Sequence, residues 1–189
     1  MKLILAAAFL LSPTALIAQA HEPGSTMPEM NSQMPAKPPV PPSHSLLVTN
    51  LGAVNGPNTK TFTVADLAKL PQVTVHVHNA HSKRDEDYTG PLVSDVFALA
   101  GLALTHENEA AILHSYVVAS ATDNYRVVYS AAEMEPGFSN SKVIVAISKS
   151  SAPNTEGGDI QLINTDGARP ARWIHGLTTL TVTTLPPTK

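Results

Sequence analysis

The alternation of apolar and polar residues predicts the strands in the first half of the chain. Residues 72–78 alternate strictly, with three valines on one face and His76 and His78 on the other. An apolar run at 45–49 predicts an earlier strand, and the charged residues of 79–87 predict a polar loop. Because side chains two residues apart leave a strand on the same side, the two histidines should share one face.

Helical spacing of apolar residues occurs next. Residues 92–100 carry an apolar stripe typical of a helix that packs on a core. Pro91 suits the first helical position, and Gly101 suits a left-handed C-cap. Thr63 has the chemistry of an N-cap and predicts a shorter helix that runs through Leu70.

The second half of the chain is typical of a sheet. The runs 116–119 and 125–129 flank a turn at 122–124 and predict a hairpin. The continuous apolar run 143–147 predicts a strand in the middle of a sheet. Further strands are expected at 160–163 and 174–183. Many strands with two or three short helices predict an α+β domain with a mixed sheet.

The N-terminal region predicts export. Residues 1–20 have a positive charge, an apolar run and a small-residue cleavage site, which are the features of a secretory signal peptide. Residues 21–45 are rich in Pro, Met and Ser and predict an extended tether, so the folded domain is 46–185. The apolar run is too short to favour a membrane span. We therefore expect a periplasmic or secreted protein that keeps no membrane span after cleavage.

Composition narrows the classes of function. A net charge of −3 with scattered basic residues argues against a nucleic-acid surface. The chain has no cysteine, so its core, rather than disulfides, must stabilise it after export. It also contains no nucleophile elbow, phosphate loop or dinucleotide fingerprint. No ordinary catalytic motif is therefore readable.

Four short motifs follow one another in a distinctive order and spacing. They are Tyr-Thr-Gly-Pro-Leu at 88–92, Asp-Asn-Tyr-Arg at 123–126, Gly-Gly-Asp-Ile-Gln-Leu at 157–162 and Ala-Arg-Trp-Ile at 171–174. On these motifs the chain resembles the small molybdopterin-binding domain of the sulfite oxidase-like oxidoreductases, in its short exported form. The resemblance covers about 46–185. It implies the sulfite oxidase-like fold, a molybdopterin cofactor and a small anionic or pterin-like ligand.

The resemblance also implies a set of cofactor-binding residues. Tyr88 would lie near the pterin side of the domain, and Asn124 would make a turn where the family often has glycine. Arg126 and Arg172 would offer guanidinium groups to a pterin phosphate. We expect His81 to face the same cleft, near Tyr88 and Arg172.

The chain departs from the family at the metal ligand. The family's enzymes hold molybdenum through a protein cysteine, and this chain has none. We therefore expect a cofactor-free ligand-binding or accessory protein on the family's fold. One alternative is a molybdopterin-dependent oxidoreductase that uses a non-cysteine ligand.

Histidines suggest a second alternative, a periplasmic copper-handling protein. His76, His78 and His81 together offer three imidazoles, the ligand set of a zinc or copper site. In the tether, the methionines at 27, 30 and 34, with His21 and His44, offer soft ligands for copper. The sequence shows no carboxylates placed to orient the imidazoles, so we expect His76 and His78 to lack metal and His81 to serve the cleft instead.

Overall fold

The computed structural model describes residues 40–51, 58–102, 109–166 and 170–186. Contacts divide the chain into two units, 1–37 and 38–189, and all described residues belong to the second unit. The predicted signal peptide 1–20 and most of the predicted tether 21–45 lie outside the described residues. Within the described ranges, no helix is long and apolar enough to cross a membrane.

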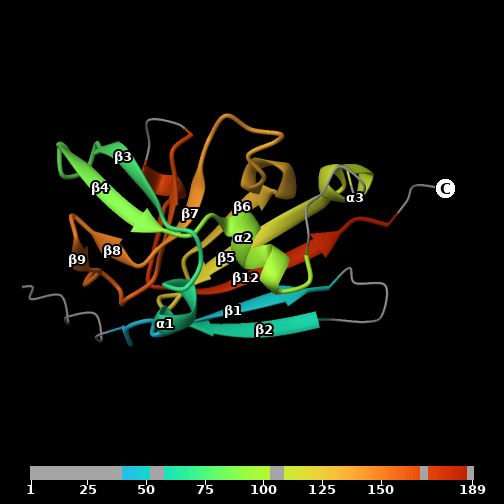
Figure 1. Cartoon of the computed structure of the whole chain (residues 1–189), viewed down its shortest axis with the longest axis horizontal. Helices are drawn as coiled ribbons and strands as arrows, with labels where there is room; N and C mark the ends of the chain where they lie inside the picture. The colour runs from blue at the N-terminus through green and yellow to red at the C-terminus, as the bar shows by residue number, and fades with distance from the viewer. Residues whose placement is uncertain (1–39, 52–57, 103–108, 167–169, 187–189) are drawn as a thin grey trace, which may run out of the picture. The chain divides into compact units, whose positions relative to one another are not determined.

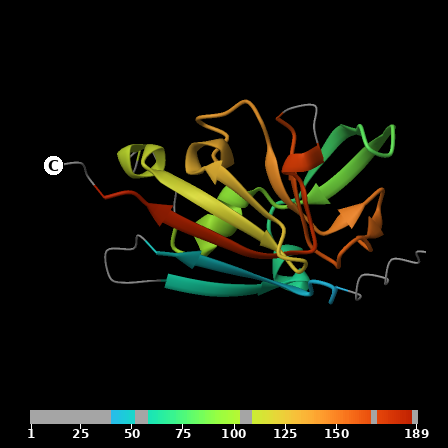
Figure 2. The same cartoon turned by 180° about the vertical axis from the view of Figure 1, so that it is seen from behind.

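The described residues form a mostly-β structure with three sheets and a few short helices (Figure 1). The expected α+β class holds only in this coarser form, because the described α-helices have seven residues or fewer. The largest sheet has the order β2-β1-β12-β5-β6 (Figure 2), and it is mixed because β1 runs parallel to β12. Its strands are β1 (Ser45–Asn50), β2 (Asn58–Thr63), β5 (Ser115–Ala121), β6 (Arg126–Ser130) and β12 (Leu177–Thr184).

Two smaller sheets complete the β-structure. One has the order β11-β10-β7 and the other has the order β3-β4-β8-β9. Their strands are β3 (Val73–Asn79), β4 (Arg84–Gly90), β7 (Val143–Ala146), β8 (Ser148–Lys149), β9 (Ala152–Pro153), β10 (Gln161–Asn164) and β11 (Ile174–His175). β4 begins at Arg84, so the predicted polar loop at 79–87 is wrong over its second half.

The apolar run that forms β7 is buried, but its predicted place in the middle of a sheet is wrong, because β7 ends the order of its sheet. Its second edge is covered by the chain that leaves β4: the Val145 amide donates to the Pro91 carbonyl at 2.9 Å. Gly90 permits this approach, since a Cβ there would lie 2.0 Å from the Val145 carbonyl oxygen. The backbone of β7 is therefore satisfied on both sides.

The helices follow their local signals with shifted ends. α1 (Val64–Leu67) has the predicted Thr63 cap, closed by a capping box with Asp66, but it ends before Leu70. α2 (Val93–Leu99) is capped by Leu92, so Pro91 precedes the helix rather than opening it. Leu99 is 48% exposed and does not belong to the buried stripe. The remaining short helices are α3 (Glu109–Leu113), η2 (Ala131–Met134) and η3 (Pro170–Arg172).

Two turns confirm their predicted backbone geometry. Asn124 has φ of 67° and connects the antiparallel pair β5 and β6, as expected for the hairpin. Gly101 has φ of 77° directly after the C-cap of α2. Both positions lie in the left-handed region, which glycine and asparagine adopt more readily than other residues.

Apolar side chains form two separate clusters. The larger one joins the five-stranded sheet to α2 and includes Phe62 and Phe97. The smaller one gathers Tyr88 and Trp173 with the side chains of β7 and β10 that face away from the larger cluster. The rings of Tyr88 and Trp173 meet edge to face at 5.9 Å. The candidate site lies beside this smaller cluster, under the hairpin of β3 and β4.

The folded domain begins before its predicted start. Ser43 is buried and forms a bridge to Gly158. Its amide donates to the Gly157 carbonyl at 3.0 Å, and its carbonyl accepts from the Asp159 amide at 2.8 Å. The predicted tether 21–45 is therefore too long at its C-terminal end, because Ser43 is already part of the packed structure.

Candidate functional site

The inner face of β4 carries a buried acidic residue. Alternation along this strand directs Glu86 and Tyr88 inward, and their exposed fractions are only 8% and 0%. A carboxylate almost never occurs in such a place without partners, because burial of an unpaired charge is costly. Glu86 is therefore the starting point of the site.

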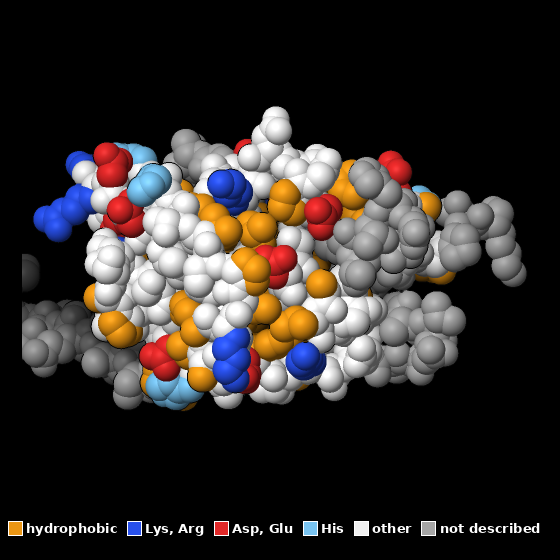
Figure 3. Space-filling model, in the orientation of Figure 1, with side chains coloured by type: hydrophobic (Ala, Val, Ile, Leu, Met, Phe, Trp, Pro, Cys, Tyr) orange, Lys and Arg blue, Asp and Glu red, His pale blue; other side chains and the backbone are white. Residues whose placement is uncertain are grey.

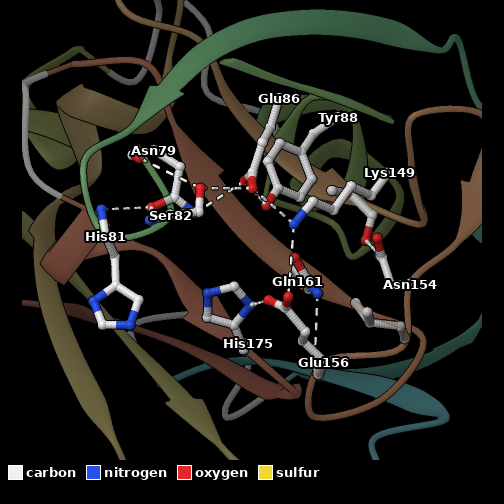
Figure 4. A network of polar contacts seen from close by, with 12 residues as sticks. Asn79, His81, Ser82, Glu86, Tyr88, Lys149, Asn154, Glu156, Gln161 and His175 are labelled. Atoms are coloured by element: carbon white, nitrogen blue, oxygen red, sulfur yellow. Dashed lines mark hydrogen bonds and ion pairs between the residues drawn. The ribbon is translucent and has the colours of Figure 1, made fainter. Parts of the chain in front are cut away.

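Four donors surround the Glu86 carboxylate (Figure 4). Its Oε2 atom accepts from the Tyr88 hydroxyl at 2.8 Å and from the Asn79 amide at 3.0 Å. Its Oε1 atom accepts from the Ser82 hydroxyl at 3.0 Å and lies 3.0 Å from the Lys149 ammonium. Burial alone would raise the pKa of Glu86, but these donors together lower it from 4.5 to about 2. The residue is held as a carboxylate.

Tyr88 is fixed as a neutral hydrogen-bond donor. Burial raises the pKa of its phenol well above the usual range, and the hydrogen bond to Glu86 raises it further. The Lys149 ammonium lies 5.5 Å from the centre of the Tyr88 ring, on its face. Lys149 comes from β8, which pairs with β4 so that Lys149 lies opposite Tyr88. The pairing of β8 with β4 therefore places the Lys149 ammonium beside the Glu86 carboxylate.

Lys149 links Glu86 to a second carboxylate, Glu156. The Lys149 ammonium lies 3.6 Å from Glu156 Oε1, and His175 Nδ1 lies 3.2 Å from Glu156 Oε2. Burial lowers the pKa of His175, and the nearby Glu156 opposes this shift only in part. His175 is therefore a neutral imidazole at neutral pH, beside a carboxylate.

Glycines bring Glu156 and His175 together. Gly157 and Gly176 follow these two residues and pack backbone against backbone. A Cβ on Gly176 would lie 2.5 Å from the Gly157 carbonyl oxygen, and both glycines have positive φ, 72° and 68°. Only glycine fits this crossing without strain.

Two buried amides complete the site. Gln161 is 0% exposed, and its Nε2 donates to the Glu156 carbonyl at 3.2 Å. Asn154 is 4% exposed, and its Nδ2 donates to the carbonyls of Ala146 and Asp159 at 2.9 and 3.0 Å. Because each nitrogen is committed to a carbonyl, the network fixes which end of each amide is oxygen.

The oxygen ends of these amides have no partner. In the described part of the chain, four buried side-chain atoms lack a hydrogen bond, and three of them lie here: Asn154 Oδ1, Gln161 Oε1 and His175 Nδ1, which lies near Glu156 Oε2 but without hydrogen-bond geometry. In its sheet, Gln161 lies directly opposite Ala146 on one neighbouring strand and His175 on the other. The side chains of Ala146, Gln161 and His175 therefore lie on the same face of the sheet. We name the whole set the buried polar cluster, with Ser82 and Glu156 as its exposed members: Asn79, Ser82, Glu86, Tyr88, Lys149, Asn154, Glu156, Gln161 and His175.

Only some of the residues predicted from the family resemblance lie close to one another in the structure. Tyr88 is in the buried polar cluster, and the exposed His81 lies at its margin, donating its amide to Asn79 at 2.9 Å. Arg172 lies elsewhere, with its guanidinium 2.5 Å from Glu133 and stacked 4.6 Å from the Tyr129 ring. It is thus committed to a carboxylate, while its neighbour Trp173 packs in the core.

The remaining predicted residues of that set lie on the β5–β6 hairpin. Asn124 and Arg126 are exposed, at its turn and at the start of β6. The Tyr125 hydroxyl donates to the Ala171 carbonyl, which places this turn beside the Arg172 segment. None of the contacts among described residues joins Asn124 or Arg126 to Tyr88 or His81.

The predicted metal ligands are also separated. His76 and His78 leave the same exposed face of β3, as alternation predicts. Each faces an aspartate across the hairpin, so the expectation that their rings lack carboxylate partners is wrong. Among the described residues, no group of three or more His, Asp or Glu side chains is placed to hold a metal ion. In the tether, His21 and the three methionines lie outside the described residues, and His44 pairs with Asp159 at 2.7 Å.

Molybdopterin can be tested against the donors present. In the family that the sequence resembles, molybdenum is held by a protein thiolate, and the chain has no cysteine. The buried polar cluster offers carboxylates, a phenol, an ammonium, amides and an imidazole instead. Arg172, the predicted phosphate anchor, is already paired with Glu133. These residues do not fit the cofactor.

The residues that carry the site were mostly missed by sequence reasoning. Glu86, Lys149, Glu156 and His175 come from segments far apart in the chain, and none lies in a recognisable motif. One signal was available for Glu86. It is two residues from Tyr88, so on a strand the two side chains share one face, while Asp85 and Asp87 lie on the other.

Comparison with known proteins gives no match, either to a protein-family model or to a curated protein.

Proposed function

We propose that this chain is an exported, cofactor-free ligand-binding or accessory protein built on the sulfite oxidase-like fold. The motif order and the export signal in the sequence support the fold and the compartment. One observation carries the binding role: two buried amide oxygens, Asn154 Oδ1 and Gln161 Oε1, have no hydrogen-bond partner among the described residues. Each such atom costs about 1–3 kcal/mol if it stays unsatisfied, so a group from outside the chain is favoured here.

The chemistry of the cluster defines what that group must offer. Both bare atoms are hydrogen-bond acceptors, so the ligand must supply donors. The charges nearby are two carboxylates, Glu86 and Glu156, and one ammonium, Lys149, which leaves one negative charge in excess. A small polar molecule with an amine or amide N–H group fits this demand. An anion would be repelled by the excess negative charge and would offer no hydrogen-bond donor to the two bare amide oxygens.

The two alternatives make different demands on metal. A molybdopterin-dependent oxidoreductase with a non-cysteine ligand would carry molybdenum, and a copper-handling protein would carry copper. Elemental analysis of protein exported by its own signal sequence separates both from the cofactor-free role. We expect no stoichiometric molybdenum, because the cluster lacks a soft ligand.

The binding role is tested by asking what the exported protein carries. Native protein is purified without denaturation, unfolded in acid, and its released small molecules are identified by mass spectrometry. We expect one small amine- or amide-bearing compound. The Gln161→Met variant removes one bare oxygen and should lower its occupancy about tenfold, the effect of one lost buried hydrogen bond.

A matched control uses the same replacement elsewhere. Gln72 also donates its amide to backbone carbonyls, those of Leu67 and Leu70, but it lies outside the buried polar cluster. Gln72→Met should therefore carry the compound at the wild-type level. Equal occupancy in the two variants would contradict the proposal, and so would a wild-type protein that releases nothing but water.

A further inference from the structure

The outer face of the β3–β4 hairpin carries two identical polar pairs side by side. The antiparallel register sets His76 opposite Asp87 and His78 opposite Asp85. His76 Nδ1 lies 2.5 Å from Asp87 Oδ1, and His78 Nδ1 lies 2.7 Å from Asp85 Oδ1. All four side chains are more than half exposed. Figure 3 shows histidine and acidic side chains gathered over this hairpin, at the upper left.

The pairing determines which ring nitrogen is available. A carboxylate at Nδ1 favours the tautomer with its proton there, so each Nε2 is left as a free lone pair. Within the described part of the chain, the hydrogen bonds and ion pairs of His76 and His78 all involve Nδ1, and none involves Nε2. A histidine whose second nitrogen donates to a carboxylate is the usual arrangement of a metal ligand. This hairpin presents that arrangement twice on one face.

We propose that His76 and His78 bind one divalent transition-metal ion, such as zinc, through their Nε2 atoms, with Asp87 and Asp85 as the carboxylates that orient the two rings. Residues two apart on a strand have Cα atoms about 7 Å apart, within reach of one ion held at about 2 Å from each nitrogen. Water fills the remaining positions, because the face is open to solvent. The site is separate from the proposed ligand-binding function.

The surroundings of the two rings suit a cation. Along this face the next cross-strand pair is Thr74 with Thr89, whose hydroxyls lie 2.8 Å apart. Glu86 and Tyr88 leave β4 on the opposite face, so the Lys149 ammonium that contacts them is directed away from the histidines. Asp85 and Asp87 place a carboxylate beside each imidazole, and both attract a dication.

The third imidazole of the sequence prediction is not required. His81 lies in the turn after β3, where its amide is tied to Asn79 Oδ1 at 2.9 Å. No third His, Asp or Glu joins the two rings in a metal-binding group among the described residues. A site with two protein ligands binds more weakly than a closed site with four, and it exchanges its ion readily.

Zinc titration of the full exported chain at pH 7.5 tests the proposal. Zinc is the probe because the thioethers at 27, 30 and 34 favour copper instead. Calorimetry gives the affinity, and the imidazole resonances of His76 and His78 in NMR spectra report the place of binding. We expect one zinc ion per chain, with both sets of resonances shifted. The His76→Ala/His78→Ala double variant should lose at least tenfold in affinity.

Two further variants distinguish a built site from an exposed histidine. His44 forms the same kind of pair, with Asp159 at 2.7 Å, but among the described residues no contact joins it to a second histidine, so His44→Ala should leave zinc affinity unchanged. Asp85→Asn/Asp87→Asn keeps both imidazoles and should weaken zinc about tenfold, the usual effect of a lost orienting carboxylate. All these side chains are exposed, so circular dichroism should show the native fold. Zinc affinity that survives the double histidine variant within twofold would overturn the proposal.

Discussion

The charge on Glu86 should make a measurable part of the domain's stability depend on pH. Folding lowers the pKa of this carboxyl from 4.5 to about 2, against the effect of burial, through its four donors. A shift of that size corresponds to about 3 kcal/mol. Because the folded pKa is the lower one, this contribution is complete above pH 4.5 and is lost as the pH falls toward 2. By pH 3, about 2 kcal/mol of it should be gone.

Glu86→Gln removes this dependence together with the charge. At pH 6 the variant should be less stable by about 3 kcal/mol, since the Lys149 ammonium loses its nearest carboxylate and one amide oxygen cannot accept from four donors. At pH 3 the folded wild-type protein still holds Glu86 mostly as a carboxylate, but most of its stabilising contribution is gone because the carboxyl of the unfolded chain is protonated. The gap between wild type and variant should therefore shrink by about 2 kcal/mol.

Urea unfolding at pH 6 and pH 3, followed by tryptophan fluorescence, measures the difference in the free energy of unfolding between wild type and Glu86→Gln at each pH. Trp173 is the only tryptophan and is buried against Tyr88, so it reports on this part of the core. Asp166→Asn is the control: this carboxylate is exposed and has no side-chain partner among the described residues. It should unfold like the wild type at both pH values. A Glu86→Gln gap that is equal at pH 6 and pH 3 would refute the account of Glu86.

Two other experiments test a backbone crossing in the site and the Arg172–Glu133 pair outside it. Gly176→Ala should lower the free energy of unfolding in urea by about 2–4 kcal/mol, because φ at this position is 68° and the new Cβ would lie 2.5 Å from the Gly157 carbonyl oxygen. Gly137→Ala is the control: no atom would lie nearer than 3.7 Å to its Cβ, so its stability should be nearly unchanged. In a double-mutant cycle, Arg172→Ala and Glu133→Ala should show a coupling of about 1 kcal/mol or less, since the pair is partly exposed. Each single replacement should cost more than the coupling, because Arg172→Ala also loses the stack on Tyr129 and Glu133→Ala also loses the capping-box hydrogen bond from the Ser130 amide; an Arg172→Ala cost no larger than the coupling would contradict the stack.

Local chemistry was readable from the sequence wherever one segment decides its own conformation. The Thr63 cap needs only Asp66 three residues later, and both hydrogen bonds of the capping box are present. Asn124 and Gly101 have the positive φ that their residue types predict. In each case the partner groups lie within a few residues, so no knowledge of the rest of the fold is required.

The site was not readable because its partners come from distant segments. The charged run before Tyr88 is typical of a loop, and nothing local shows that it pairs with β3. Once this segment pairs with β3, Asp87 and Asp85 lie opposite His76 and His78. The carboxylates that orient the two imidazoles are therefore supplied by the partner strand. Burial of Glu86 likewise depends on Lys149, which β8 supplies.

The strand β4 shows how one register can serve two kinds of chemistry. Asp85, Glu86 and Asp87 are consecutive, so alternation separates the buried carboxylate from the two exposed ones. A slip of one residue would bury Asp85 and Asp87 among apolar side chains and expose Glu86, leaving Asn79, Tyr88 and Lys149 without their acceptor. The network around Glu86 thus penalises a slip of one residue. That same register aligns both aspartates with both histidines, so the inner network favours the geometry on which the proposed metal site depends.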